Sequence, residues 1–544
     1  MKRLATACLA LFAIIAVAHA GDDWEAKVAA YRKSQKRPSL WKRTLGREAI
    51  AATRDKRAIE LLAEDYAKPE KPHDQVQYLC ASIATLYFND KDSVEPLDAW
   101  RVKHTDAEDA WLWYRVLSVH QQFRGADDVI AIVKDPELDV FLRAAALEAI
   151  AMRSDGDMLG LIQELLNNLP DDKQRWVLVE SCMNAMRRQT AKLDDDAFRH
   201  PANQLARMLD QDVVPEHTKY AIARTFRDIF KAEHAWLTSA PWLKRIAGET
   251  GRVPSRTLAQ PSFLGLQAEG TRICYVIDMS DSMLTPLTDK EKQDLRNPVT
   301  GHGKYDDPDE KAPPPKADPE IEALPWDKIV TRFDAACEFL KLSLRKLTDE
   351  QEFAVIWFGT DAGLLDECKG MQKVNDKRVE KVIEELDAIK PGKPTTARPQ
   401  GTLRGMTNLH GGIQRAFKCK SKGLIKDYEY VDWLGFTQGA DTIFLLSDGK
   451  QSWSDWDAVD STDSDDVAGD PESGYGADEG GGEHSELHFY GPYVDERHML
   501  DDFTRMNLFR KCEIHCIGIG EADSRALKAI AQIGHGNLRI VGER

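Results

Sequence analysis

The chain has 544 residues, more than a single hydrophobic core usually organises, so two or more domains are expected. Hydrophobic residues make up 42% of it and charged residues 30%, a balance that is typical of folded protein and excludes a largely disordered chain. The formal net charge of −17 disfavours binding to nucleic acid or to an anionic membrane surface.

The first twenty residues have the pattern of a secretory signal peptide. Lys2 and Arg3 precede an apolar run over 4–17, and Ala18-His19-Ala20 supplies the small residues that a signal peptidase recognises. The run is short for a membrane span, and no later segment approaches the required length. We therefore expect an exported protein, in the periplasm, the cell envelope or outside the cell; the alternative is an uncleaved N-terminal anchor. Cleavage would leave 71 basic and 90 acidic residues, a net charge of −19.

Residues 21–249 are expected to form a helical domain. Apolar residues recur there at helical spacing, and short polar breaks such as 153–156 and 170–172 separate the segments. The predicted helices include 56–66, 75–88, 107–122, 140–152, 158–169, 174–188 and 218–231. Paired helices at this spacing resemble HEAT-like repeats, although a plain helical domain fits nearly as well.

A linker is predicted at 250–269, and beyond it strands and helices alternate. The predicted strands are 273–277, 353–358, 442–446, 514–519 and 538–541, and the predicted helices are 331–346, 376–388, 409–418 and 524–533. This alternation is typical of a doubly wound, mostly parallel α/β sheet covered by helices on both faces, here over 270–544.

Two inserts interrupt the alternation. Residues 285–326 are rich in proline and charge, so an extended loop is expected there. Residues 451–496 contain many Asp, Glu and Gly residues and neither Lys nor Arg, which favours a solvated loop. A calcium site in this second insert is an alternative, although the acidic spacing lacks the EF-hand pattern.

Eight cysteines remain after the predicted signal peptide. They are scattered through the chain rather than arranged as a dense disulfide framework. Cys274, Cys512 and Cys516 lie in or beside apolar strands, where buried free thiols are expected. His515 does not turn the last two into a zinc site, because the other ligands are missing.

Oxygen-bearing side chains follow the predicted strands where ligands bind in open α/β sheets, at the carboxyl ends. Asp278, Ser280 and Ser282 alternate in the loop after the first strand, Thr407 lies just before the helix at 409–418, and Asp448 follows the strand at 442–446. Two carboxylates and three hydroxyls, without nitrogen or sulfur, suit a hard divalent cation, with room for an acidic group from a partner. We expect Mg²⁺, with Mn²⁺ or Ca²⁺ as alternatives.

The same residues resemble the von Willebrand factor type A (VWA) family over roughly 270–541. Its metal ion-dependent adhesion site (MIDAS) is written Asp-x-Ser-x-Ser, then Thr, then Asp, and the segments 273–283, 405–409 and 444–449 are similar to its three loops in the same order. The resemblance implies that Ser280, Ser282 and Thr407 contact the metal, and that Asp278 and Asp448 act directly or through water. Asp281 departs from the usual glycine and would crowd the turn or add negative charge.

These observations predict an exported, metal-dependent binding or adhesion protein that recognises an acidic group of a protein partner. Phosphate-binding loops, nucleophile elbows and His-Glu-x-x-His motifs are absent from the sequence, so we do not expect an enzyme. The alternatives are a metal-free envelope scaffold that acts through its helical domain and, less favoured, a metal-dependent hydrolase. Some relatives of the family assist AAA-type ATPases, but those systems are cytoplasmic, which the signal peptide disfavours.

Overall fold

A computed structural model describes residues 24–37, 40–68, 75–151, 158–193, 195–249, 260–296, 318–389, 406–426, 430–455 and 492–542. The predicted signal peptide, Gly405, most of the acidic insert and the middle of the proline-rich insert lie outside these ranges. Within them, no helix is both long enough and apolar enough to cross a membrane.

The N-terminal half is helical, as predicted. Its α-helices are α2 (Trp24–Ser34), α3 (Leu40–Ala51), α4 (Arg57–Tyr66), α5 (Gln75–Tyr87), α6 (Val94–Arg101), α7 (Ala110–Arg124), α8 (Asp127–Lys134), α9 (Val140–Ala151), α10 (Met158–Asn167), α11 (Arg175–Arg187), α12 (Asp196–Met208), α13 (Glu216–Ile229) and α14 (Ser239–Ile246). Short 3₁₀ helices are η1 (Lys91–Ser93), η2 (Ala107–Asp109) and η3 (Thr190–Lys192).

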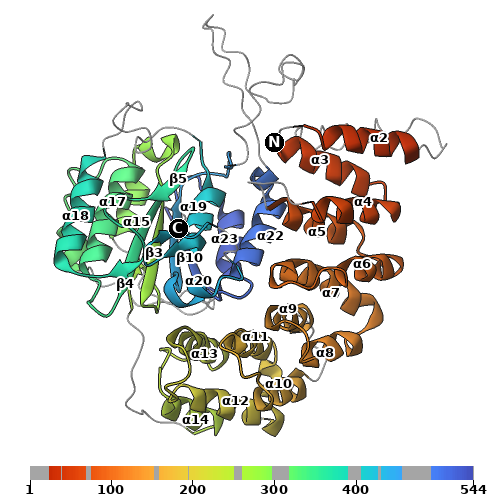
Figure 1. Cartoon of the computed structure of the whole chain (residues 1–544). Helices are drawn as coiled ribbons and strands as arrows, with labels where there is room; N and C mark the ends of the chain where they lie inside the picture. The colour runs from red at the N-terminus through yellow and green to blue at the C-terminus, as the bar shows by residue number, and fades with distance from the viewer. Residues whose placement is uncertain are drawn as a thin grey trace, which may run out of the picture.

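These helices stack in two layers. One layer is the series α3, α5, α7, α9, α11 and α13, in which each helix packs on the next. In the second layer, α4 packs on α6, and α12 packs on both α10 and α14. Figure 1 shows the stack curving around the α/β half, from α2 at the top right to α14 at the bottom. The HEAT-like comparison stays a prediction.

The C-terminal half contains a seven-stranded sheet in the order β11-β10-β9-β3-β4-β5, with β6 also paired to β4. Its strands are β3 (Arg272–Asp278), β4 (Glu352–Phe358), β5 (Ala362–Leu364), β6 (Gln372–Lys373), β9 (Thr442–Ser447), β10 (Glu513–Ile519) and β11 (Leu538–Val541). The pairs joining β3, β4, β9, β10 and β11 are parallel, whereas β5 and β6 run antiparallel to β4. The predicted mostly parallel sheet is confirmed.

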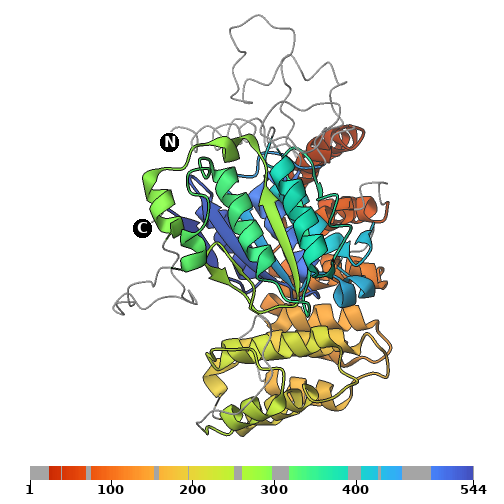
Figure 2. The same cartoon turned by 90° about the vertical axis from the view of Figure 1, so that its left-hand side faces the viewer.

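Both faces of the sheet are buried, which explains the continuous apolar runs of its strands. In β3, Ile273, Tyr275 and Ile277 point into one core, and Cys274 and Val276 point into the other. The first core is covered by α17 (Arg332–Arg345) and α18 (Asp376–Ala388), which are among the green helices facing the viewer in Figure 2. The second core is covered by α19 (Leu409–Lys418), α22 (Glu496–Asn507) and α23 (Ser524–Ile533).

The structure corrects the predicted loop at 285–326, because it contains two helices. These are α15 (Asp289–Arg296) and α16 (Pro319–Glu322), and the buried side chains of Leu295 and Ile321 anchor them to the first core. The sequence did not indicate these helices, because each contributes a single apolar residue to the core within a segment rich in proline and charge. That residue is buried only by contacts with the rest of the domain. The expectation for the middle of this insert lies outside the described residues.

The predicted linker at 250–269 also needs correction. Its last part forms a hairpin of β1 (Ser262–Phe263) and β2 (Leu266–Gln267), whose Phe263 and Leu266 pack in the first core of the sheet. The α/β half therefore begins before residue 270. Further short elements that the sequence did not indicate are η4 (Asp281–Leu284), β7 (Cys419–Lys420), β8 (Gly423–Leu424), α20 (Trp433–Gln438) and η5 (Pro492–Val494).

The two halves share one hydrophobic core. Tyr430, Phe436 and Phe509 of the C-terminal half belong to the core cluster of the helical half. Phe141 of α9 packs on Phe436 and Phe509, with ring centroids 5.9 and 5.2 Å apart. Because large aromatic side chains are buried across this boundary, the halves form one packed unit rather than two independent domains joined by a linker.

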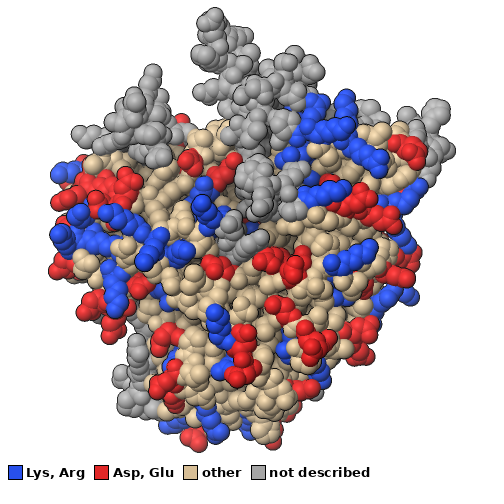
Figure 3. Space-filling view, viewed as in Figure 1, with Lys and Arg blue, Asp and Glu red and all other residues tan. Residues whose placement is uncertain are grey.

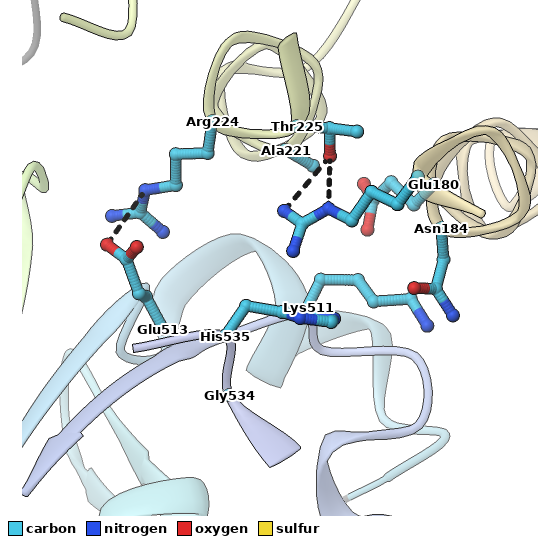
Figure 4. Close-up of a pocket in the computed structure, with 10 residues that line it drawn as sticks. Glu180, Asn184, Ala221, Arg224, Thr225, Lys511, Glu513, Gly534 and His535 are labelled. Carbon is cyan, nitrogen blue, oxygen red and sulfur yellow. Dashed lines mark hydrogen bonds and ion pairs between the residues drawn. The ribbon is translucent and has the colours of Figure 1, made fainter. Parts of the chain in front are cut away.

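A buried ionic network flanks that apolar contact. Arg227 of α13 pairs with Glu513 of β10 at 2.6 Å and with Glu269 at 2.7 Å, and Arg224 approaches Glu513 at 3.7 Å. Although burial opposes it, the positive charge of Arg227, followed by His515 and Arg224, holds the pKa of Glu513 well below its ordinary value. Figure 4 shows Arg224 reaching from its helix toward Glu513, with Lys511 and His535 beside them.

All eight cysteines after the predicted signal peptide are free and buried: Cys80, Cys182, Cys274, Cys337, Cys368, Cys419, Cys512 and Cys516. Burial raises the pKa of Cys516, so this thiol stays protonated at neutral pH. The expectation of buried free thiols is confirmed.

Candidate metal centre

Asp278 is the last residue of β3, the strand between β4 and β9. Its carboxylate is completely buried and accepts hydrogen bonds from the backbone nitrogen of Ser280 (2.9 Å) and from the Ser447 hydroxyl (2.7 Å). Burial, followed by the negative charge of Asp448, raises the pKa of Asp278 to about 6, although bonds from Ser280 and Ser447 lower it. The side chain is thus held rigidly and still ionises near neutral pH.

The loop after β3 brings two hydroxyls together. Ser280 occupies the N-cap position of the short helix η4, and its Oγ atom lies 3.0 Å from Oγ of Ser282. Ser282 in turn donates a 2.6 Å hydrogen bond to Oδ1 of Asp448, which follows β9. Since β3 and β9 are parallel neighbours, their carboxyl ends meet at one edge of the sheet, and this places residues far apart in the chain in contact.

Thr407 reaches the same edge from the loop before α19. The backbone nitrogen of Asn408 donates to the carbonyl of Gly359, just after β4, and this bond fixes the loop against the sheet. A β-carbon on Gly449 would lie 3.5 Å from Oγ1 of Thr407 and 3.6 Å from Oγ of Ser282. Both hydroxyls therefore face Gly449, and the loops that carry the five side chains singled out by the sequence meet at one edge of the sheet.

The second carboxylate has a partner that the sequence did not indicate. Nη1 of Arg332 donates to Oδ2 of Asp448 at 3.0 Å, while Ser282 occupies the other oxygen. Arg332 is the first residue of α17, whose N-cap is Thr331. A cation is unfavourable at the positive end of a helix dipole, so the buried charge of Arg332 needs an acidic partner at this position. The charge at this position is a local sign of an acidic partner, but which residue provides it depends on packing, because Arg332 and Asp448 are 116 positions apart.

The donor set fits a hard divalent cation. Neighbouring ligands of an octahedral Mg²⁺ site with 2.0–2.1 Å bonds lie about 2.9 Å apart. The Ser280–Ser282 and Ser282–Asp448 oxygen separations of 3.0 and 2.6 Å are close to that edge length. Within the described ranges, no group of three or more His, Cys, Asp and Glu residues is placed to hold a metal, and the candidate centre has two carboxylates beside its hydroxyls.

The site opens toward solvent at its rim. Asp278, Ser280, Thr407 and Asp448 are buried, whereas Ser282 is half-buried and Asp281 is exposed. Asp281 does not have a positive φ, so replacing the family's usual glycine does not strain this turn. It adds negative charge at the surface rather than crowding the metal position.

Two hollows in the described surface lie elsewhere, along the boundary between the halves. One is lined by residues that include Arg187, Asp228 and His535. Another includes Glu513, at the start of β10, whereas the candidate centre lies beyond the carboxyl ends of the strands. These hollows are therefore separate from the centre.

Comparison with known proteins identifies the fold of the C-terminal half. Residues 330–461 and 495–540 match the family described as von Willebrand factor type A domain. The match includes Thr407 and Asp448, whereas β3 and the loop with Asp278, Ser280 and Ser282 precede it. The C-terminal half therefore contains a VWA domain, following a largely helical N-terminal region.

A solved structure described as von Willebrand factor type A from Catenulispora acidiphila is also similar, with 14% sequence identity and a TM-score of 0.26. The similarity covers 51% of this chain and 39% of that one, so the chain spans well under half of the length of that structure. No curated protein matches the chain.

Proposed function

We propose that this protein is an exported binding protein whose VWA domain captures a protein partner through a divalent cation. Ser280, Ser282, Thr407, Asp278 and Asp448 would hold the cation, with Mg²⁺ favoured and Mn²⁺ or Ca²⁺ as alternatives. The cation would supply an open coordination position for an acidic group of the partner. The single observation that carries the proposal is the chain of contacts from Ser280 through Ser282 to Asp448 at the carboxyl edge of the sheet.

The partial exposure of the centre supports a binding role. The centre is buried at its base and half-open at Ser282, which suits one external group rather than an enclosed substrate. On the face shown in Figure 3, acidic and basic side chains are interspersed. We accordingly propose that recognition depends on the cation rather than on a broad field of one charge.

The test is titration of the mature chain, Gly21 to Arg544, with Mg²⁺, Mn²⁺ and Ca²⁺ by calorimetry. The whole chain is needed because the halves share a core. Saturable binding that is lost in Asp278→Ala and Asp448→Ala but kept in Asp349→Ala, an exposed aspartate, would support the proposal. A folded wild-type chain that binds none of the three cations would overturn it.

Recognition of an acidic group needs a separate test. A short peptide with one aspartate should bind the Mg²⁺-loaded chain and be released by chelator, whereas the same peptide with asparagine should not bind. Equal binding of both peptides in chelator would instead favour the alternative of a metal-free scaffold that acts through the helical half.

Export and the absence of catalysis are also proposals. N-terminal sequencing of the protein from fractionated cells should give a chain that begins at Gly21 outside the cytoplasm; an intact Met1 in the cytoplasm would contradict export. A panel of ester, amide and phosphate substrates with Mg²⁺ should show no turnover beyond that of Asp448→Ala. Turnover that this substitution abolishes would favour the metal-dependent hydrolase.

A further inference from the structure

Arg332 lies where a positive charge is costly. Its guanidinium is largely removed from solvent, with a side-chain exposure of 10%, and it lies at the first position of α17, next to the positive end of the helix dipole. Burial of a charge in such a place is tolerated only when strong partners compensate it. The position is therefore maintained by specific contacts rather than by solvation.

The chain provides those contacts from three separate segments. Asp448 accepts from Nη1 at 3.0 Å, and Glu291 of α15 lies 3.5 Å from Nε. Gly520 follows β10 with φ +71°, and a β-carbon there would overlap the guanidinium of Arg332. Two carboxylates thus compensate the charge, and one glycine makes room for it.

The partner of Arg332 is one of two buried carboxylates at the same edge of the sheet. Asp278 ends β3 and Asp448 follows the neighbouring parallel strand β9, and they are 0% and 2% exposed. Without a cation, two such groups repel each other in a medium where charges are poorly screened. Arg332 supplies one positive charge to this pair from within the chain.

We propose that Arg332 is a tethered counter-cation for Asp448, which neutralises the centre in the metal-free protein and lowers its affinity for a divalent cation. This inference rests on the proposed function, because it concerns the same centre. An incoming cation must share Asp448 with the fixed positive charge of Arg332, which weakens its binding. Once the cation is bound, the centre carries more positive charge than it would without Arg332. Arg332 therefore weakens cation binding and strengthens the attraction for an acidic partner.

The test compares Arg332→Met with Arg345→Met, which removes an exposed arginine from the same helix. Mg²⁺ affinity is measured by calorimetry on the mature chain, and metal-free stability is measured by urea unfolding in EDTA. Arg332→Met should bind Mg²⁺ about tenfold or more tightly than wild type. It should also unfold at lower urea concentration in EDTA, and Mg²⁺ should restore most of the loss. Arg345→Met should resemble wild type in both measurements.

The outcomes separate this inference from the proposed function. Equal Mg²⁺ affinity of wild type and Arg332→Met would overturn the inference and leave the function standing. Binding by Arg332→Met alone would support the inference and overturn cation-dependent binding by the natural chain. Failure of both to bind would overturn both.

Glu291→Gln keeps the test decisive if Arg332→Met does not fold. It leaves the guanidinium on Asp448 and removes its second negative neighbour, so Mg²⁺ affinity should fall severalfold. Glutamine can still accept the hydrogen bonds that Glu291 receives from Thr288. Unchanged or tighter Mg²⁺ binding in this variant would contradict the proposed role of Arg332.

Discussion

Ser282 donates a 2.6 Å hydrogen bond to Asp448, although the two residues are 166 positions apart. The bond joins the loop after β3 to the loop after β9, the two loops that carry four of the five candidate ligands. The same serine lies 3.0 Å from Ser280, so a single hydroxyl links both loops of the centre. Its removal should affect cation binding more than it affects folding.

Ser282→Ala should therefore weaken Mg²⁺ binding by about tenfold or more while costing about 1 kcal/mol of stability, the usual net value of one hydrogen bond. Calorimetry and urea unfolding measure the two effects. Thr437→Ala, which removes a hydroxyl that bonds within its own helix, is the control and should leave Mg²⁺ affinity unchanged. A large loss of stability with unchanged affinity would show that Ser282 is structural.

Gly449→Ala tests whether space between the hydroxyls matters. The added methyl would lie at ordinary contact distance, 3.5 Å from Thr407 and 3.6 Å from Ser282, and Gly449 does not have a positive φ. The free energy of unfolding should therefore change by less than about 1 kcal/mol. The methyl group would nevertheless face both hydroxyls. We expect Mg²⁺ affinity to fall at least about tenfold, since each such step corresponds to about 1.4 kcal/mol. Unaltered affinity would place the cation away from Gly449.

Asp278 should make the metal-free protein sensitive to pH. Its pKa is about 6 in the folded protein and 3.8 by reference, so ionisation costs stability as pH rises between these values. Relative to wild type, Asp278→Asn should gain up to about 3 kcal/mol of stability between pH 4 and pH 7 in EDTA. Urea unfolding across this range measures the gain, which should level off above pH 7. A constant difference between the two proteins would contradict the raised pKa.

The same ionisation predicts how cation binding depends on pH. A cation needs the ionised form of Asp278, so Mg²⁺ affinity should fall as pH decreases from 7 to 5, and binding at pH 6 should release protons. Calorimetry in two buffers with different ionisation enthalpies detects the protons. Proton release that persists in Asp448→Ala, which should not bind, would point to a different site.

The ionic network between the halves should contribute strongly to stability. Glu513→Gln leaves Arg227 and Arg224 without their shared carboxylate in a buried place, which should cost about 3 kcal/mol or more. Urea unfolding followed by tryptophan fluorescence measures the loss. Glu380→Gln, which removes an exposed partner of Arg345, should cost less than about 1 kcal/mol. Similar losses in both variants would show that the network adds little.

Regular elements and the candidate ligands could be predicted from the sequence because their signals are local. Helical spacing of apolar residues identified α9 and α11, and continuous β-branched and apolar runs identified β3 and β9. Asp278, Ser280, Ser282, Thr407 and Asp448 were found because each lies just after a strand or just before a helix. The order of these loops along the chain was sufficient to suggest the VWA domain that the family match identifies.

Tertiary structure decided what depends on distant partners. Helix α15 and the β1–β2 hairpin form in segments of weak local pattern, because Leu295 and Phe263 are buried by residues far away in the chain. The joint core of the two halves and the network around Glu513 likewise depend on contacts that the linear order does not contain. Arg332 is the sharpest case: sequence places it only at the start of a helix, and packing sets its guanidinium 3.0 Å from Asp448. The pairing of buried charges follows from three-dimensional proximity, whereas periodicity and loop position are properties of the chain itself.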